Sequence, residues 1–458
     1  VSVRAMNRPA PITFAEVKEE AGTVTLRGSR MTVTYRPDKL PFHGGNLEVS
    51  DASGKRLWRP GMVDTANLGG VHWAMDWVGR GLTPSGVHEA TMDHYPNTSE
   101  WDLWRFYSRM RETDAGDLTE EELRRNPDEV VASLPPRRQP GAVRDLFYHR
   151  SKFPPGPLSR AGYFMYNDSC TPVVNESDGW VVGRPGEVGY HDLYLFCYGH
   201  DFAAALRDVR RLFGASTLLP RYSLGLWFSR FPTFTDPQLR EIVAEFEVHG
   251  LPLDVIVLDM EWHQRGWHGW DWSPSHFENP DAFFDFLKSK DLHATLNVHP
   301  QVVPAEDSRF QRFVKEAGIM VLDEDCRSTE LGPGLVFGKF DACVPSHARA
   351  FLEVLHKPVE DQGVDFWWID GAMPVRSVAN LDGQLWTNHL YQRHMQLHHP
   401  DRRPMVFSRT PGLGAHRYAF HFTGDTRSSW ETLANQVEQT LRAGHMGQSF
   451  VTHEIGGH

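Results

Sequence analysis

The feature that most constrains the fold is a change of pattern near residue 220, after which short apolar runs alternate with amphipathic stretches. Continuous apolar runs of this length are typical of strands buried on both faces of a parallel sheet, and the stretches between them have helical spacing. Strands and helices in alternation indicate an α/β fold. The expected strands are 223–229, 253–259, 293–298, 366–370, 405–408, 419–424 and 449–453.

Seven strand–helix units in series are one unit short of a (β/α)8 TIM barrel. The chain stops at His458, soon after the seventh expected strand. We therefore expect a TIM barrel truncated after strand 7, and a chain that is a fragment of the natural protein. Helices are expected over 236–249 and 281–290, the second after the start signal Asn279-Pro280.

Up to about residue 215 the pattern differs, because short stretches rich in β-branched residues are separated by turn residues. This pattern predicts antiparallel β structure, and we expect an N-terminal β-sandwich domain over 1–215 before a catalytic barrel over 216–458, incomplete at its C-terminus. A charged, proline-rich segment over 114–141 indicates a surface insertion, and 200–214 has the spacing of a helix that leads into the barrel.

The formal net charge of −12 bears on the choice of partners. An acidic chain repels nucleic acid and anionic membrane surfaces, so we expect neither as a partner. No uncharged apolar run approaches the roughly 18 residues that span a bilayer. The four cysteines have no CxxC spacing and are too few for a disulfide framework, which slightly favours a cytoplasmic protein over a secreted one.

Polar residues follow each of the expected strands. The carboxyl ends of the strands carry the active site in essentially every characterised TIM-barrel enzyme. A single polar residue at such a position more often caps a helix or forms a turn, but here all of the expected strands end this way. These residues are Ser229, Arg230, Asp259, Glu261, His263, Asn297, His299, Asp370, Ser408, Arg409, Asp425, His453 and Glu454.

Two of them, Asp370 and Asp425, indicate a class of reaction. Glycoside hydrolysis uses paired carboxyl groups, one ionised and one protonated because its surroundings raise its pKa. Tryptophans in the same half of the chain would offer apolar faces to sugar rings. The alternative is that the tryptophans form the core and that Asp370 caps the next helix. The tryptophans are Trp227, Trp262, Trp267, Trp270, Trp272, Trp367, Trp368 and Trp430.

The motifs GLWFSR, PLDVIVLDMEWH, ATLNVHP, FWWIDG, HFTGD and HEIGGH resemble glycoside hydrolase family 31 in their sequence and order. Upstream, NLGG, LSRAGYFMYNDS and DGWV resemble the N-terminal β-sandwich domain of that family. The resemblance implies a retaining exo-α-glycosidase that acts on terminal α-linked sugars of oligosaccharides or glycoconjugates. It also implies that no metal and no organic cofactor takes part.

Carried over motif by motif, Asp370 of WWID would be the nucleophile and Asp425 of HFTGD the general acid/base. In a retaining site the two carboxyl groups lie about 5–5.5 Å apart. Asp259 of VLDMEWH and Arg409 of the SRT segment would contact the sugar. The resemblance places Trp368, His299 and Trp262 in the same pocket.

The sequence departs from the family directly after the nucleophile. The nearest branch has LDMDWH and WWIDWQQG motifs and includes α-N-acetylgalactosaminidases, but Gly371-Ala372-Met373-Pro374 replaces its WQQG segment. Glu261 and Glu454 stand where aspartates are usual. The smaller and apolar residues would leave more space beside Asp370. The sugar stays open among α-glucosides, α-galactosides and α-N-acetylgalactosaminides.

Two other functions are compatible with the same motifs. A transglycosylase would use both aspartates and pass the sugar to another sugar, whereas a non-catalytic glycan-binding homologue would need neither carboxylate. No metal site is expected. His394 and His398 are spaced i, i+4, but a solvent-facing helix end before Pro400 accounts for them, and His453-Glu454 lacks the second histidine of an HExxH motif.

Overall fold

A computed structural model describes residues 3, 16–39, 44–60, 62, 64, 66–70, 156–169, 171–175, 177–184, 192–231, 233–265, 268–300, 306–320, 340–409, 412–418, 420–424 and 430–455. In these parts of the chain, no helix combines the length and apolar character that crossing a bilayer requires. The insertion expected over 114–141 lies outside the described residues, as do Trp267 and Asp425.

The first part of the chain is antiparallel, as its sequence pattern predicts. One sheet has five strands that pair in chain order: β1 (Glu16–Glu20), β2 (Thr23–Arg27), β3 (Met31–Tyr35), β4 (Leu47–Asp51) and β5 (Arg56–Trp58). Two further pairs join β6 (Tyr163–Asn167) to β9 (Leu193–Cys197) and β7 (Val173–Val174) to β8 (Val181–Val182).

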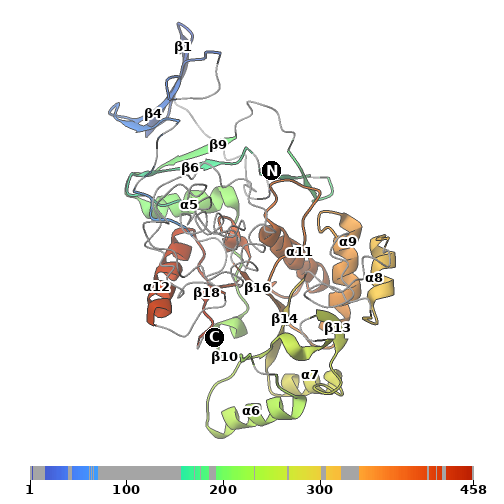
Figure 1. Ribbon diagram of the computed structural model, residues 1–458. Coiled ribbons are helices and arrows are strands. Elements are labelled where there is room, and N and C mark those ends of the chain that lie inside the picture. Colours follow the sequence, from blue (N-terminus) through green and yellow to red (C-terminus); the bar gives the residue numbers. More distant parts are fainter. Residues whose placement is uncertain are drawn as a thin grey trace, which may run out of the picture.

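Side chains of β4, β5 and β6 connect the first two of these sheets. Val49, Trp58 and Tyr163 are buried together in one small core. Strands β6 and β9 also pack against helix α5 (Phe202–Phe213), where the Phe213 ring meets the Tyr166 ring edge-on with centres 4.8 Å apart. The first two of these sheets are thus attached to the second half of the chain through α5 (Figure 1), whereas β7 and β8 pack directly against the large core of that half.

The second half is built on a seven-stranded parallel sheet whose strands follow one another in chain order, as in a TIM barrel. The strands are β10 (Trp227–Phe228), β11 (Val255–Leu258), β14 (His293–Val298), β15 (Phe366–Ile369), β16 (Val406–Arg409), β17 (Phe420–Phe422) and β18 (Val451–Thr452). A hairpin of β12 (His263–Arg265) and β13 (His268–Trp272) follows β11.

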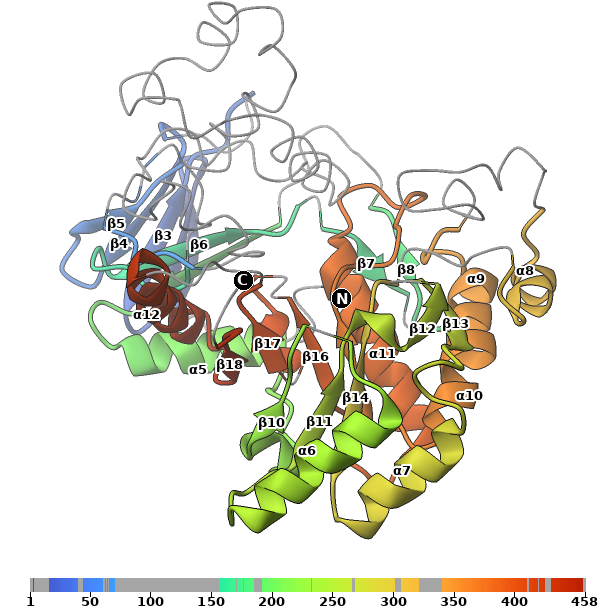
Figure 2. The same cartoon turned by 60° about the horizontal axis from the view of Figure 1, so that its bottom comes forward.

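Helices flank this sheet, most of them in front of it and to its right in Figure 2 and the last one to its left. They are α6 (Asp236–Val248), α7 (Pro280–Ser289), α8 (Phe310–Ala317), α9 (Pro345–Ala350), the π-helical segment η8 (Phe351–His356), α10 (Lys357–Glu360), α11 (Gly383–His398) and α12 (Trp430–His445). Short 3-10 turns are η5 (Arg221–Leu224), η6 (Met260–Trp262) and η9 (Ala415–Arg417).

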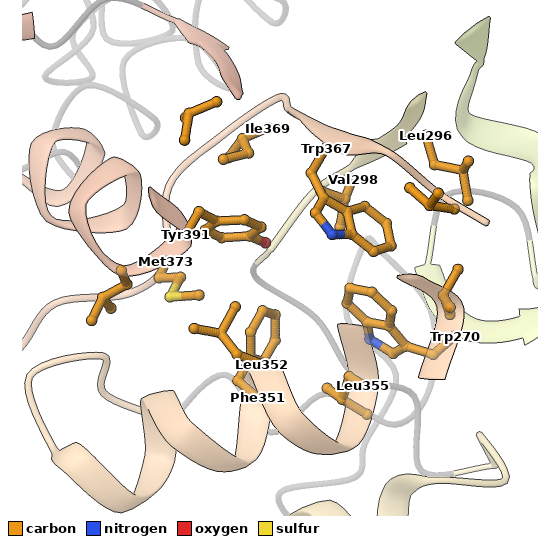
Figure 3. Close-up of a cluster of buried hydrophobic side chains, with 14 of the residues drawn as sticks. Trp270, Leu296, Val298, Phe351, Leu352, Leu355, Trp367, Ile369, Met373 and Tyr391 are labelled. Atoms are coloured by element: carbon orange, nitrogen blue, oxygen red, sulfur yellow. The ribbon is translucent and has the colours of Figure 1, made fainter. Parts of the chain in front are cut away.

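Alternation along the strands separates two apolar cores. Trp367 and Ile369 of β15 face the helices and belong to the large core that Figure 3 shows with Tyr391 and other side chains of the helical layer. Phe366 and Trp368 belong to a second core, made mainly of strand residues. Because side chains along a strand alternate between two faces, Asp370 continues the row of Phe366 and Trp368 on the face away from the helices.

The predicted elements agree with the structure to within one or two residues at most ends. Strand β14 occupies the predicted 293–298, and α6 begins where the capping box of Thr235 and Gln238 indicates. The strand predicted over 223–229 is wrong at its start, because Arg221–Leu224 form the turn η5 and leave only two residues in β10.

Candidate active site

Asp370 follows the last residue of β15 at the carboxyl edge of the parallel sheet. Its backbone N–H donates to the carbonyl of Val298 at 2.9 Å, so the sheet ladder extends to this residue. Ile369 pairs with Val298 on one side and with Ser408 on the other. The ends of β14, β15 and β16 therefore meet around the Asp370 carboxylate.

Arg409, the last residue of β16, holds one oxygen of this carboxylate. Its Nε and Nη2 donate to Oδ1 of Asp370 at 2.8 and 2.7 Å. The guanidinium carbon lies 5.1 Å from the centre of the Phe422 ring, and the residue is only 6% exposed. Charge-assisted hydrogen bonds in such a buried setting are strong and fix orientation as well as charge.

The second oxygen, Oδ2, has longer contacts. Asn297 donates to it through Nδ2 at 3.2 Å, and Nε2 of His299 lies 3.6 Å away. Asn297 was recognised in the sequence only as a strand-tip residue and not as part of the site. The signal that would have included it is its spacing of two from His299, which puts both side chains on the same face of β14.

These contacts decide the charge of Asp370. Burial is the largest single influence and disfavours the ionised form, but the Arg409 guanidinium, His299 and the Asn297 amide oppose it together and hold the pKa of Asp370 below its ordinary value. The carboxylate is therefore ionised at neutral pH although its side chain is 10% exposed.

The segment after Asp370 turns away from the site. Gly371 has a φ of 147°, a backbone conformation that favours glycine. The side chain of Met373 is 0% exposed and lies in the core beside Tyr391 (Figure 3), and its N–H donates to the Thr387 hydroxyl at 2.8 Å. The Met373 side chain therefore fills the core under helix α11, and the expectation that the replaced segment leaves more space beside Asp370 stays a prediction.

Asp259 follows β11, and the pairing of Leu258 with Leu296 sets it level with Asn297. Its carboxylate accepts from the Met260 N–H at 2.8 Å and so caps the turn η6. A hollow beside it is also lined by Trp262 and Arg230, and Asp370 is not among its lining residues. Asp259 thus lies between this hollow and the Asp370 end of the sheet.

The predicted tryptophans do not share one environment, and Trp430 is 83% exposed. Trp262, Trp270 and Trp367 are 1% exposed and pack against one another in the large core, and the Trp262 indole donates to the Asn297 carbonyl at 2.9 Å. For these three the core interpretation fits the structure. Trp368 lies instead on the Asp370 face, against Phe407 and Phe422, and its buried Nε1 has no hydrogen-bond partner in the described part of the chain.

Some of the other residues predicted at strand ends do not contact Asp370. Ser408 is buried and accepts from Asn388, so it belongs to the packing of α11 on β16. Burial lowers the pKa of His453, which lies 3.5 Å from the Thr423 hydroxyl at the β17–β18 edge. Asp425 and the side chain of Glu261 lie outside the described residues.

Comparison with known families gives one match, described as the glycosyl hydrolases family 31 TIM-barrel domain, over residues 216–458. Among characterised proteins, an α-xylosidase of Saccharolobus solfataricus is 22% identical over 294 residues, which are 59% of this chain and 38% of the relative. Neutral α-glucosidase AB of Homo sapiens is 27% identical over 299 residues, 59% of this chain and 31% of the relative. The chain thus matches less than two fifths of these two proteins.

Solved structures match the fold over more of the chain. A dextranase of Flavobacterium johnsoniae in complex with glucose superposes with a TM-score of 0.63 at 18% identity, covering 100% of this chain and 55% of that one. An α-xylosidase from a soil metagenome in complex with xylose gives 0.61 at 17% identity, covering 99% and 66%. At these identities the likeness concerns the fold.

Proposed function

Because the chain belongs to glycosyl hydrolase family 31, we propose that it is a retaining exo-α-glycosidase with Asp370 as its nucleophile. The observation that carries the proposal is the contact set of that carboxylate. Arg409 binds Oδ1 through two N–H groups, whereas within the described part of the chain Oδ2 has contacts of 3.2 and 3.6 Å. Arg409 thus orients the Asp370 carboxylate and favours its ionised form through Oδ1, which leaves Oδ2 as the nucleophilic atom.

Catalysis would take two steps. Oδ2 of Asp370 bonds to the anomeric carbon while the glycosidic bond breaks, and the leaving oxygen takes a proton from Asp425. Asp425 then removes a proton from water, whose oxygen attacks the anomeric carbon and releases Asp370. The lowered pKa of Asp370 supports this role, because a nucleophile must be ionised before the first step.

The other residues would bind the sugar that carries this anomeric carbon. Asp259, Trp368 and His299 are proposed as direct contacts. Trp368 lies in β15 on the face of Asp370, His299 follows the neighbouring strand β14, and Asp259 follows β11, the next strand beyond β14. Trp262 would act on the sugar indirectly, because its indole N–H holds the Asn297 carbonyl and the ring lies beside Asp259. We add Asn297, because its amide donates to the attacking oxygen and would hold that oxygen in line with the sugar.

For the substrate we propose a terminal α-glucoside or α-xyloside before the other sugars. Relatives of this chain are named α-glucosidases and α-xylosidases. An α-N-acetylgalactosaminide stays a second candidate, because the LDMEWH motif resembles that branch. A β-sandwich over 1–215 and a catalytic domain over 216–458 complete the proposed architecture.

Transfer of the sugar to an acceptor sugar is the alternative chemistry at the same site, because water and sugars compete for the same intermediate. A non-catalytic glycan-binding protein is less well supported. A binding protein has no need of a buried carboxylate that an arginine keeps ionised. Burying these two charges costs free energy of folding, which a catalytic role explains.

The proposal is tested with a panel of aryl α-glycosides: glucoside, xyloside, galactoside, N-acetylgalactosaminide and sulfoquinovoside. We expect turnover of at least one. With an Asp425→Ala variant and a substrate that has an activated leaving group, we expect a covalent sugar adduct, which peptide mass spectrometry should locate on Asp370. Binding of sugars without any turnover or adduct would favour the non-catalytic alternative, and an adduct on another residue would remove Asp370 as nucleophile.

A further inference from the structure

A second cluster of ionisable side chains lies on the opposite side of the sheet from Asp370, near the C-terminal end of α11. Glu353 of η8 faces His394 and His398 of α11, and their ligand atoms lie within 4.8 Å of one another. His394 is only 3% exposed at its side chain. The sequence-based expectation of a solvent-facing helix end is therefore wrong for His394, although His398 is 25% exposed.

The distances within the cluster fit a single small cation. Oε1 of Glu353 lies 2.7 Å from Nε2 of His398 and 3.7 Å from Nδ1 of His394. Ligand atoms bound at about 2.0–2.1 Å in a tetrahedral zinc site are roughly 3.3 Å apart, which lies between these two values. The i, i+4 spacing brings both imidazoles to one face of α11, with ring centres 4.5 Å apart.

A second layer of contacts orients the buried histidine. Nε2 of His394 lies 3.0 Å from Oε2 of Glu360, whose Oε1 accepts the indole N–H of Trp367 at 2.7 Å. When Nε2 donates to this carboxylate, Nδ1 presents a lone pair toward Glu353. A carboxylate behind a ligating histidine is the usual support of a metal site, because it fixes the tautomer and makes the ring more basic.

From this geometry we propose that Glu353, His394 and His398 bind one zinc ion, with water as a fourth ligand. Two imidazoles and one carboxylate are ligands that zinc accepts. Without the ion, the Nδ1 lone pair of His394 and the Glu353 oxygen face each other at 3.7 Å, and a cation between them removes the repulsion. The partial exposure of His398 and Glu353 gives the ion a route from solvent.

The site is structural and separate from the proposed catalysis. It joins η8 to α11 and, through Glu360 and Trp367, to the buried face of β15. Asp370 lies beyond the carboxyl end of the same strand and on its other face. Zinc should therefore raise thermal stability and leave the rate of glycoside turnover unchanged.

The test uses the 458-residue chain after treatment with a chelator and desalting. Zinc is added alone, and bound metal is measured by elemental analysis and calorimetry while unfolding is followed by scanning calorimetry. We expect one tightly bound equivalent and a rise of about 2–5 °C in the unfolding midpoint at a hundredfold excess over the dissociation constant. Cobalt in place of zinc should give the visible absorption of a tetrahedral site.

Two variants at the exposed ligands, His398→Ala and Glu353→Gln, should weaken this binding at least tenfold and abolish the rise in midpoint. His249→Ala is the control, because His249 also contacts a glutamate, Glu245, at 3.3 Å, but the described part of the chain places no second histidine with this pair. It should bind zinc like the unsubstituted chain. Absence of a tight equivalent, or equal binding by all variants, would overturn the proposal and leave a hydrogen-bonded Glu–His pair.

Discussion

Strand β15 has a buried carboxylate system at each of its two ends, and the two differ in how their oxygens are used. At the carboxyl end, Asp370 has two short bonds on Oδ1 and, within the described part of the chain, longer contacts on Oδ2. Near the amino end, Glu360 accepts from Trp367 on one oxygen and contacts His394 on the other, at 2.7 and 3.0 Å.

The difference separates a site that can react from one that holds the structure. Each oxygen of Glu360 contacts a buried neighbour and its side chain is 4% exposed, so this carboxylate is closed off from solvent and stabilises the packing of α10 and α11 on β15. Asp370 is oriented by Arg409 but keeps one oxygen for a substrate. In a TIM barrel this matches the general division between a catalytic carboxyl edge and a stabilising amino edge.

The largest expected effect is on turnover and comes from Asp370→Asn. The amide cannot attack the anomeric carbon, and its NH₂ group faces either the Arg409 or the Asn297 donors. We expect the turnover number to fall about 10⁴-fold or more on any substrate that the unsubstituted chain cleaves. Steady-state kinetics measure this, and calorimetry checks that the variant is folded.

A carboxylate before the same strand is the matched control. Asp365 accepts from the Ala294 N–H at 3.0 Å and lies 3.1 Å from Nδ1 of His293. Asp365→Asn should leave turnover within about twofold, because it lies at the amino end of β15. A comparable loss of turnover in both variants would mean that Asp370 acts through the stability of the strand and not as the nucleophile.

The second effect is on stability and comes from Glu360→Gln. Glutamine is neutral and has one acceptor oxygen, so the side chain loses the charge that both contacts favour and its NH₂ group faces either the Trp367 N–H or the His394 ring. Removing one partner of a buried charged contact typically costs about 3 kcal/mol. Urea unfolding should report this loss, while the turnover number of the folded fraction stays within about twofold. A strong fall in turnover without a loss of stability would contradict the assignment of catalysis to the carboxyl end of β15 and of stability to its amino end.

The sequence was sufficient for the fold of the second half because each strand there is a continuous apolar run with helical spacing on either side. It was also sufficient to bring Asp370, Arg409 and His299 to one edge, since parallel strands end at the same level. The predicted start of strand β10 is wrong because the strand propensity of residues 223–229 does not reveal the 3-10 turn at Arg221–Leu224.

The contacts that distinguish the two ends were not predictable. Glu360 and His394 are 34 residues apart in the chain, and Asn297 and Asp370 are 73 apart. No local pattern marks such pairs, because hydrogen bonds of this kind depend on which helix packs beside which strand. Met373 illustrates the same point, since an apolar residue after the nucleophile could have lined the site or entered the core.

The smallest effect is a pH dependence of stability that comes from His356, near the amino end of β15. Burial lowers the pKa of His356 to about 3, with a smaller opposing influence from Glu360. Its Nε2 lies 2.6 Å from the Tyr391 hydroxyl and Nδ1 lies 3.1 Å from the Phe351 carbonyl. The unfolded chain, in which histidine has its ordinary pKa of about 6.5, therefore binds more protons than the folded chain between about pH 6.5 and 3.

The contribution of neutral His356 to the free energy of unfolding is complete above the pKa that this histidine has in the unfolded chain. It is lost as the pH falls toward the pKa that it has in the folded chain. Between pH 7.5 and 5 the loss is about 2 kcal/mol, which urea unfolding at the two pH values should detect. His356→Asn should remove that part of the pH dependence, with the contributions of other buried histidines cancelling in the comparison. Asp370, with its lowered pKa, stays ionised over this range, so the proposed nucleophile keeps its charge while the amino end weakens. An unchanged pH dependence in the variant would mean that His356 is not neutral in the folded chain.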